Sequence, residues 1–449
     1  MRHYDFIALG GGNAGLTAAS RVARAGQRTA LVDHGPVGGL CSLNGCNPKK
    51  VLVRSTEVLD EVRRAAEFGL AVSEPRIEWS RVIDRKERFT KPSTPATEHS
   101  LKQQGIDLIQ GAPRFVAKNA LEVNGERLEA EGIVVATGSA PQALKFEGAE
   151  RVKTSDDLLA LRTVPQRLAI FGAGAVAFEF GHVFARLGSQ VTMLVRDTQA
   201  LRRHEPDLVD ALVDFSTQKL GMALIFQATV QAVHAQGEDL TVEFEAEGKV
   251  QTLPADFVLN AAGRLPSISD LALDTASVAT DKHGVVVNEF LRSPSNSHVF
   301  AAGDAHGQLQ LSPVASYEGQ IVAKNFLEGD TERVNYEAIP KVLFTVPPLA
   351  SVGLTEAEAR ARGLEVSAVT HDMREWKVYA IAGEPLARAK VIIEAGTGRI
   401  LGAHLLGGGA NEVINLFALA MRFGITAPNL KAMVFAYPTF ANALPYTLS

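Results

Sequence analysis

Cys41 and Cys46 are the residues in this sequence best suited to redox chemistry. They are the only cysteines among 449 residues and lie five positions apart. A structural disulfide would close a very short loop and add little stability, so the spacing favours a reversible redox pair over a structural disulfide or two inert thiols. A disulfide joins Cα atoms roughly 4.4–6.8 Å apart, whereas positions i and i+5 of an ideal helix lie at least ~7.5 Å apart. We therefore expect irregular backbone at Asn44 and Gly45, which tolerate left-handed dihedral angles.

The residues that follow Cys46 favour its thiolate form. Pro48 suits the first position of a helix, which would place Cys46 just before the helix N-terminus. Lys49 and Lys50 add positive charge close in sequence. A helix N-terminus and nearby lysines both lower the pKa of a thiol, because they stabilise its negative charge.

The composition indicates a large α/β protein of about three domains, at ~150 residues each. The chain is 46% hydrophobic and contains 39 glycines, and its net charge of −5 is small, so nucleic acid is not an expected partner. No apolar run approaches the ~18 residues that a membrane span needs. The first expected strand begins too close to Met1 to leave room for a targeting segment. A lone cysteine pair suits a reducing cytosol, so we expect a cytoplasmic protein.

A glycine-rich turn near the N-terminus predicts a dinucleotide site rather than an ordinary βαβ turn. An apolar strand at 4–9 is followed by GGGNAG, a match to GxGxxG, and then by helical spacing over 16–25. The glycines let backbone NH groups approach a pyrophosphate at the helix N-terminus. The next strand ends in an acid, 18 residues beyond the last glycine, which can accept a ribose hydroxyl. The residues predicted to bind the cofactor here are Gly10, Gly12, Asn13, Ala14, Gly15 and Asp33.

A second glycine-rich turn, GAGAVA at 172–177, predicts another dinucleotide site. It follows an apolar strand and has alanine in place of the third glycine. The next strand, at 190–195, ends at Arg196, with Arg202 six residues later. Arginine in this place suits the 2′-phosphate of NADPH, whereas an acid would suit NADH; the alternative is a solvated arginine cluster. The residues predicted to bind NADPH are Gly172, Gly174, Arg196 and Arg202.

Three further apolar strands follow along the chain, and the first ends in a small turn, which suits a chain that passes close to a cofactor. They are expected at 133–138, 257–263 and 299–304. The last one ends in Asp304, which could bind a cofactor sugar or cap a helix.

The remaining pattern predicts one long helix and a third domain. A charged helix at 79–104 should be interrupted around Pro92 and Pro95. From residue 336 onward the pattern favours a mostly antiparallel sheet and one helix, with strands at 342–345, 389–394 and 400–406 and the helix at 412–422.

In order and spacing, these motifs resemble the flavin-dependent pyridine nucleotide–disulfide oxidoreductases, the group of glutathione reductase, dihydrolipoamide dehydrogenase and mercuric reductase. The segments that carry the resemblance span nearly the whole chain and are GGGNAG, GGLCSLNGCNPKK, VVATGS, GAGAVAFE, AAGRLP, FAAGDA, FTVPPLASVGLTE and AYPTFA. The resemblance implies an α/β fold with two Rossmann-like domains and a C-terminal α+β domain that forms a homodimer. The implied ranges are 1–150 and 265–335 for FAD binding, 151–264 for NAD(P)H binding and 336–449 for the interface.

The resemblance also implies roles for single residues. Glu179 and Lys49 would form an ion pair near flavin N5. Cys46 would be the charge-transfer cysteine nearer the flavin, and Cys41 the interchange cysteine that attacks the acceptor. Asp304 would bind the ribityl chain of FAD, while the first glycine turn and the acid after it would hold the ADP half. The other positions implied to contact a cofactor are Lys50, Thr137, Gly138, Gly263 and Gly303.

The sequence departs from the family at three places. Tyr437 stands where the family has a histidine that shuttles a proton from the partner subunit, and Asn442 stands where a glutamate orients it. A tyrosine has a pKa of ~10 against ~6.5 for histidine, so Tyr437 can donate a proton but is a poor base. Ala175 replaces the tyrosine that covers the nicotinamide pocket of glutathione reductase. The chain also lacks the C-terminal cysteine pair of mercuric reductase, which argues against that activity.

We therefore expect an NADPH-dependent flavoprotein disulfide reductase, a homodimer with FAD and NADPH as cofactors and no metal. Electrons would pass from NADPH through FAD to the Cys41–Cys46 disulfide and on to a small oxidised acceptor with a good leaving group. A mixed disulfide, a persulfide or a metal–thiol adduct would qualify. One alternative is an NAD(P)H oxidase, diaphorase or quinone reductase that uses the flavin directly, and another is a flavin-bound redox sensor with little turnover.

Overall fold

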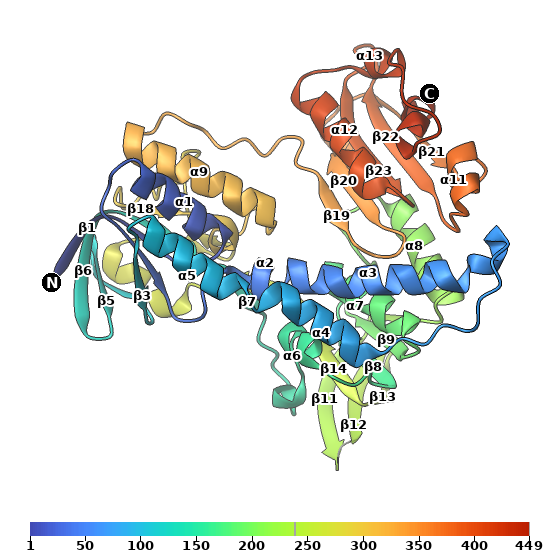
Figure 1. Cartoon of the computed structure of the whole chain (residues 1–449), viewed down its shortest axis with the longest axis horizontal. Helices are drawn as coiled ribbons and strands as arrows, with labels where there is room; N and C mark the ends of the chain where they lie inside the picture. Colours follow the sequence, from blue (N-terminus) through green and yellow to red (C-terminus); the bar gives the residue numbers. More distant parts are fainter. Residues whose placement is uncertain (238, 449) are drawn as a thin grey trace.

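The computed structural model describes residues 1–237 and 239–448, which form three parts, each built on its own sheet (Figure 1). Glu238, inside the expected range 151–264, and Ser449, at the end of the range 336–449, lie outside the described residues. Helix α3 (Cys46–Arg63) runs across the middle of the molecule, between the parts built on the second and third sheets. The helix that begins at a cysteine is therefore placed where the parts meet.

The first sheet has a parallel core, in the order β3-β2-β1-β6, extended by β18 beside β6 and by the antiparallel strands β5 and β4. Strand β1 is apolar because both of its faces are buried, with Phe6 to Leu9 inaccessible to solvent. Helices α1 and α9 lie side by side against this sheet. The strands are β1 (Arg2–Leu9), β2 (Thr29–Asp33), β3 (Asp107–Gln110), β4 (Arg114–Ala117), β5 (Ala120–Val123), β6 (Glu126–Val135) and β18 (Val299–Ala301). The helices of this part are α1 (Asn13–Arg24), α2 (Gly39–Leu43), α5 (Ser93–Gln103) and α9 (Ser312–Glu328), with η1 (Ala65–Phe68), η3 (Ser269–Leu271), η4 (Leu273–Ala276), η5 (Gly303–Ala305) and the short pair β16 (Thr280–Asp281) and β17 (Gly284–Val285). Helix α4 (Trp79–Thr90) packs instead against α3 and the core of the second part.

The second sheet is parallel, in the order β10-β9-β8-β14, and packs against a three-stranded antiparallel sheet, β11-β12-β13. A two-stranded ribbon of β7 and β15 joins the first part to the second. The strands are β7 (Ser139–Pro141), β8 (Arg167–Phe171), β9 (Gln190–Val195), β10 (Ala223–Phe226), β11 (Thr229–Gln236), β12 (Asp239–Ala246), β13 (Lys249–Ala255), β14 (Phe257–Asn260) and β15 (Arg264–Pro266). The helices are α6 (Ser155–Ala160), α7 (Ala175–Arg186), α8 (Pro206–Gln218) and η2 (Ala149–Arg151).

The third sheet is antiparallel, in the order β19-β20-β23-β22-β21, as the pattern after residue 336 predicts. Its central strand β23 is buried along its whole length. The elements are β19 (Lys341–Leu343), β20 (Leu349–Gly353), α10 (Glu356–Ala361), β21 (Val366–Asp372), α11 (Lys377–Ala382), β22 (Arg388–Glu394), β23 (Ile400–Leu406), α12 (Ala410–Arg422), α13 (Ala427–Lys431) and η6 (Phe440–Leu448).

Two local expectations need correction, although the predicted break between α4 and α5 is confirmed. Helix α3 begins at Cys46 rather than at Pro48, so this cysteine is the first helical residue and not the one before it. Asn44 and Gly45 break the backbone between the cysteines, but neither is left-handed, since both have φ of −135°. Gly45 is needed for space instead, because a Cβ atom there would lie 2.8 Å from the carbonyl oxygen of Leu40.

Candidate active site

The two cysteines lie where two helices and the start of a third come together. Cys41 lies in α2 and Cys46 begins α3; both are thiols and both are partly buried. The Cys46 Sγ atom lies 3.1 Å from the hydroxyl oxygen of Ser312, the first residue of α9. The amide of Asn13, in the first glycine turn, donates a hydrogen bond of 3.3 Å to the carbonyl oxygen of the same serine. The thiol pair and the glycine turn are thus parts of one site.

The surroundings place the negative charge of the thiol pair on Cys46. The pKa of Cys46 is lowered to about 6, chiefly because the Cys41 thiol donates a hydrogen bond to it. The Ser312 hydroxyl and the charges of Lys50 and Lys49 act in the same direction. The same hydrogen bond, together with burial, raises the pKa of Cys41. At neutral pH the pair is therefore one thiolate and one thiol, as sulfur exchange requires.

Ser312 is a residue of this site that the sequence reasoning missed. It lies 266 positions from Cys46, and no spacing rule joins the two. The one available signal was the pair Ser312-Pro313, which suits the start of a helix but does not say what lies before it.

A buried carboxylate lies behind the thiols. Glu179 of α7 forms ion pairs with both Lys49 and Lys50, the latter at 3.1 Å, and its side chain is 3% exposed. The backbone NH of Phe344 donates a further hydrogen bond of 2.8 Å to it. Burial raises the pKa of Glu179, but the two lysines outweigh burial and the pKa lies below its ordinary value. The predicted contact between Glu179 and Lys49 is therefore present, and Lys50, which also lies 3.9 Å from the Phe344 ring centre, shares it.

The same face of α7 carries two more buried polar side chains. Arg186 pairs with Asp60 of α3 at 2.6 Å and donates to the carbonyl oxygen of Val346 at 2.6 Å. The backbone NH of Val346 in turn donates to Nδ1 of His182 at 3.3 Å. Together with Glu179, Arg186 and His182 join α3, α7 and the segment between β19 and β20.

The first glycine turn lies at the carboxyl edge of the first sheet, where several parallel strands end together. Strand β1 leads into the turn, β2 ends in an acid, β6 leads to Thr137 and Gly138, and β18 leads to Gly303 and Asp304. In sheets of this kind, nucleotides bind at this edge. The predicted residues that lie there are Gly10, Gly12, Asn13, Ala14, Gly15, Asp33, Thr137, Gly138, Gly303 and Asp304.

The acid at the end of β2 fixes the shape of the turn. Asp33 accepts hydrogen bonds from the backbone NH groups of Gly11 at 2.6 Å and Gly35 at 2.9 Å. A Cβ atom on Gly39, whose φ is +66°, would lie 2.5 Å from the Cα atom of Gly12. Only glycine therefore allows the cysteine-bearing helix α2 to lie directly against the turn.

Two polar groups at this edge are suited to a polar ligand. The hydroxyl oxygen of Thr137 is buried and has no hydrogen-bond partner among the described residues. Burial raises the pKa of Asp304, whose carboxylate accepts a hydrogen bond of 2.6 Å from Ser139. Asp304 lies inside η5 rather than at the end of a strand, so it does not cap that helix. Buried polar atoms are normally satisfied, so the unpaired Thr137 hydroxyl at this edge is available to a ligand.

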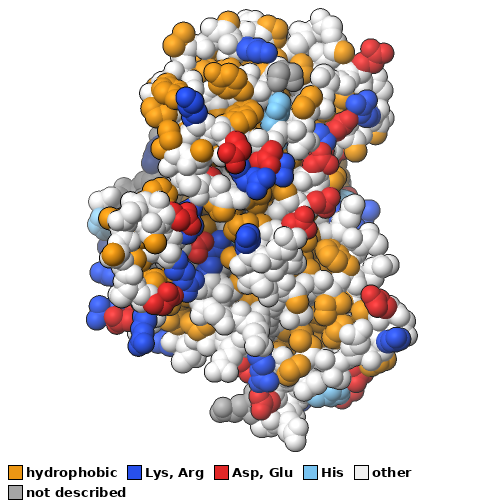
Figure 2. All heavy atoms as spheres, turned by 90° about the vertical axis from the view of Figure 1, so that its right-hand side faces the viewer, with side chains coloured by type: hydrophobic (Ala, Val, Ile, Leu, Met, Phe, Trp, Pro, Cys, Tyr) orange, Lys and Arg blue, Asp and Glu red, His pale blue; other side chains and the backbone are white. Residues whose placement is uncertain are grey.

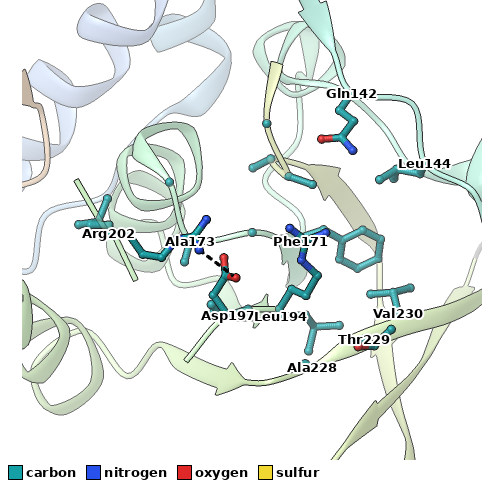
Figure 3. A pocket seen from close by; sticks show the side chains of 18 of the residues that line it. Gln142, Leu144, Phe171, Ala173, Leu194, Asp197, Arg202, Ala228, Thr229 and Val230 are labelled. Carbon is teal, nitrogen blue, oxygen red and sulfur yellow. Dashed lines mark ion pairs between the residues drawn. The ribbon is translucent and has the colours of Figure 1, made fainter. Parts of the chain in front are cut away.

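The second glycine turn borders a cavity of about 710 Å³ at the carboxyl edge of the second sheet (Figure 3). The predicted residues that line it are Gly172, Gly174, Arg196, Arg202 and Gly263. In Figure 3, Arg202 lies on one side of this cavity and Phe171 and Val230 lie on the other. Arg202 forms an ion pair of 3.3 Å with Asp197, while Arg203 and His204, which follow it, line the cavity as well. A basic, partly apolar cavity beside a glycine turn suits a nicotinamide dinucleotide.

Tyr437 lies on the surface of the third part, between α13 and η6. Its side chain is 64% exposed, and Val434 and Met433 beside it are exposed as well. The expectation that Tyr437 faces the thiols of a partner subunit stays a prediction. Over residues 1–237 and 239–448, His, Cys, Asp and Glu form no grouping that could hold a metal ion. None of the helices in that part of the chain is long and apolar enough to cross a membrane.

Comparison with known proteins defines the class. The description "Pyridine nucleotide-disulphide oxidoreductase" matches residues 4–319, and its dimerisation domain matches residues 339–447. The chain belongs to this family of FAD-dependent oxidoreductases that use pyridine nucleotides, which confirms the predicted family and fold class.

Several individual proteins are similar over nearly the whole chain. A mercuric reductase of Staphylococcus aureus is 33% identical over 98% of this chain and 81% of its own length. A glutathione reductase of Burkholderia cepacia is 31% identical over 98% of each protein. The solved structure of the HOCl-induced flavoprotein disulfide reductase RclA from Escherichia coli superposes with a TM-score of 0.89, at 28% identity over 99% of each chain. A Cu(II) complex of RclA superposes equally well, at 27% identity over 100% of this chain and 99% of that one.

The residues at the carboxyl edge of the first sheet fit FAD. The glycine turn leads into α1, whose first turn has no side-chain cap, so its backbone NH groups are available to a pyrophosphate. The unpaired Thr137 hydroxyl and the carboxylates of Asp33 and Asp304 are the kinds of group that FAD hydroxyls and ring atoms require.

Proposed function

We propose that this chain is an NADPH-dependent flavoprotein disulfide reductase that works through Cys41 and Cys46. The observation that carries the proposal is the arrangement of the two sulfurs. The Cys46 Sγ atom lies 3.1 Å from the Ser312 hydroxyl oxygen, and a hydrogen bond from Cys41, the Ser312 hydroxyl and the charges of Lys50 and Lys49 lower the pKa of Cys46. A cytoplasmic location, where such a pair persists in reduced form, is part of the same proposal.

We assign the two cofactor sites to the carboxyl edges of the first and second sheets. Residues 1–150 and 265–335 would bind FAD, residues 151–264 would bind NADPH, and residues 336–449 would form the dimer contact. Asp33 and the first glycine turn would hold the ADP half of FAD, and Asp304 its ribityl chain. When bound, FAD supplies the two-electron chemistry that links a nicotinamide to a disulfide. The other proposed cofactor contacts are Lys50, Thr137, Gly138, Gly263 and Gly303.

The protein's own residues, Cys41 and Cys46, carry out the sulfur exchange with the acceptor. One hydride equivalent from NADPH opens the Cys41–Cys46 disulfide, which leaves the Cys46 thiolate and the protonated Cys41. The Cys46 thiolate takes the proton of the Cys41 thiol hydrogen-bonded to it, so that the Cys41 thiolate attacks one sulfur of an acceptor RS–SR′ and forms a mixed disulfide with it. R′S⁻ departs and takes up this proton from Cys46, which becomes a thiolate again. Finally, the Cys46 thiolate attacks the Cys41 sulfur, which releases RS⁻ and closes the disulfide again.

Tyr437, in place of the family's histidine, restricts which oxidised acceptors the enzyme can reduce. Without a histidine, the site lacks the base that the family uses to take a proton from the attacking thiol and return it to a poor leaving group. Acceptors that need little proton transfer are therefore favoured, namely mixed disulfides, persulfides and metal–thiol adducts. Two similar proteins support the last class, since one is named a mercuric reductase and the structure of another is a complex with Cu(II).

The test compares acceptors under one set of conditions. NADPH oxidation is followed with glutathione disulfide, a glutathione persulfide and a Cu(II)–glutathione adduct, using the parent and Cys41→Ser. We expect turnover with the persulfide or the adduct to exceed turnover with glutathione disulfide by at least tenfold, and Cys41→Ser to abolish it. Equal rates for parent and variant would show that the cysteines are not used.

A second candidate function is an NAD(P)H oxidase or quinone reductase that bypasses the cysteines. One observation favours it: Ala175 is exposed where it lines the cavity, so the nicotinamide pocket has no covering side chain at this position. Full NADPH–quinone turnover in Cys41→Ser, with no turnover of any sulfur acceptor by the parent, would favour this candidate over the first.

A further inference from the structure

A buried ion cluster around Lys390 plays no part in the sulfur chemistry. Lys390 lies on β22 and is 5% exposed, and its Nζ atom lies 2.8 Å from a carboxylate oxygen of each of Glu205, Asp207 and Glu356. Burial lowers the pKa of Lys390, but the three carboxylates outweigh burial and raise it above its ordinary value. A buried ammonium group persists only with such partners, so the cluster is a fixed joint between the second and third parts of the molecule.

Glu205 connects this joint to the NADPH pocket. It is the last residue of the segment 196–205, which carries both arginines predicted to bind NADPH and leads from β9 into α8. Its side chain is 3% exposed. One carboxylate oxygen accepts from Lys390, and the other accepts from the backbone NH of Glu356 at 3.0 Å. The end of the arginine segment is therefore fastened to the third part of the molecule.

The same segment is fastened at a second point, beside the glycine turn. The backbone NH of Leu201 donates a hydrogen bond of 3.0 Å to the carbonyl oxygen of Ala173. Leu201 has a φ of +47°, so the chain turns sharply there. Arg202 and Arg203, which both line the cavity, lie between this point and Glu205. The hydrogen bond of Leu201 and the contacts of Glu205 therefore fix the backbone positions of Arg202 and Arg203 between them.

We propose that Glu205 and Lys390 are positioning residues for NADPH, because they fasten the arginine segment so that Arg202 is held beside the 2′-phosphate. This inference rests on the proposed NADPH specificity of the cavity. A loop that is already ordered loses no conformational entropy when the ligand binds. Loss of the anchor should therefore weaken the contact between Arg202 and the 2′-phosphate. The glycine turn at 172–175, which would hold the 5′-phosphates, lies outside this segment, so its contacts should remain.

The direct test is binding of two small probes, adenosine 2′,5′-bisphosphate and 5′-AMP, measured by calorimetry on the FAD-loaded protein. The parent should prefer the bisphosphate. Glu205→Ala removes both anchor contacts, and it should weaken the bisphosphate by about three- to tenfold while leaving 5′-AMP within about twofold. With NADPH, KM should rise by a similar factor while kcat stays within about twofold.

The cluster itself provides a matched control. Asp207→Asn also removes a carboxylate from Lys390, but it leaves both contacts of Glu205 in place, so its probe affinities should equal those of the parent. Lys390 keeps two carboxylate partners in each single variant, which protects the fold. If Glu205→Ala does not fold, Glu205→Gln weakens the same anchor without emptying the site.

Each result decides the inference. A bisphosphate affinity that is unchanged in the Glu205 variants, or a loss shared equally by 5′-AMP, overturns the positioning role, since the second pattern reports general damage to the pocket. A parent that binds both probes equally overturns the proposed NADPH specificity, and this inference with it. These failures are distinguishable, because the first appears in the variants and the second in the parent.

Discussion

Ser312 is the residue that best shows how the protein controls its reactive sulfur. Its hydroxyl lies 3.1 Å from Cys46 Sγ at the beginning of a 17-residue helix. A hydrogen bond to a charged group is worth ~1.5–3 kcal/mol, and one pKa unit corresponds to ~1.4 kcal/mol. This one side chain can therefore move the thiolate population substantially near neutral pH.

In a Cys41→Ser background, which is the parent of this comparison, Ser312→Ala should raise the pKa of Cys46 by roughly 1–2 pH units. The thiolate is present above this pKa and is lost as the pH falls through it, so the variant should lose reactivity at a higher pH than the parent. The measurement is the pH profile of the rate of alkylation by iodoacetamide, in a Cys41→Ser background in which Cys46 is the only cysteine. Ser312→Thr keeps the hydroxyl and should restore the parent profile. Identical profiles for the alanine variant and the parent would show that Ser312 does not stabilise the Cys46 thiolate.

The sequence identified the residues of this site that are close neighbours in the chain or that follow a motif. The cysteine pair, Lys49 and both glycine turns lie where the motifs indicate. The contact between Ser312 and Cys46 could not be predicted, because it joins two helix starts 266 positions apart and depends on how α9 packs beside α1. The sharing of Glu179 by two lysines depends likewise on the angle between α3 and α7.

Helix α7 is the element that relates the parts of the molecule to one another. Glu179, His182 and Arg186 follow one another at helical spacing, so they share one face, and each contacts the segment that includes Phe344 and Val346. Helix α3, which carries Cys46, contacts the same face at both of its ends. The relation between the thiols and the cavity beside the second glycine turn therefore depends on this helix.

Arg186→Met should lower Tm by about 2–6 °C, because the carbonyl oxygen of Val346 loses a buried donor and Asp60 loses its cation. Asp60 is 25% exposed and can be partly rehydrated, which limits the loss. Differential scanning fluorimetry gives the comparison. Arg162→Met is the control: this exposed arginine pairs only at the surface and should leave Tm unchanged. An Arg186 variant as stable as this control would contradict the role given to α7.

Element boundaries were predictable only where the hydrophobic pattern continued to the end of the element. Strand β23 was placed correctly because every residue in it except His404 is apolar or small, and all seven are buried. The start of α3 was misplaced by two residues, because the preference of proline for the first turn does not fix which position of that turn it takes. In this helix Pro48 is the third residue, and Cys46 gains the position nearest the N-terminus.

At the scale of the whole molecule, the third part is built to meet a second copy. Leu419 lies in the last turn of α12 and Phe423 is the residue that caps its C-terminus; they are 50% and 73% exposed, and Val434 nearby in sequence is 98% exposed. The matched dimerisation domain covers all three residues. Figure 2 shows hydrophobic side chains gathered over the upper part of one face of the molecule, above a group of acidic and basic side chains.

Leu419→Glu combined with Phe423→Glu should convert the dimer into monomers, because four carboxylates would be buried at one contact. Sedimentation velocity measures the mass directly. The monomer should keep its FAD, since the residues that fit it lie in the first part of the molecule. A variant that remains dimeric would place the contact elsewhere.

Tyr437→His combined with Asn442→Glu should add the missing acid–base group across the dimer. We expect the rate with glutathione disulfide to rise by at least tenfold, since a positioned acid–base typically contributes ~10²–10⁴. Tyr437→Phe is the control and should leave the rate with metal–thiol adducts near that of the parent. No gain in the double variant would mean that position 437 does not face the thiols of the partner subunit.

The proposed function requires that electrons from NADPH reach the disulfide of Cys41 and Cys46, and one measurement tests this transfer directly. The oxidised, FAD-loaded protein is mixed anaerobically with one equivalent of NADPH, alkylated, and analysed by mass spectrometry for label on Cys41 and Cys46. We predict that both cysteines become labelled within one turnover, and that NADP⁺ and opened disulfide form in equal amounts. NADPH consumption with the disulfide left intact would contradict the account.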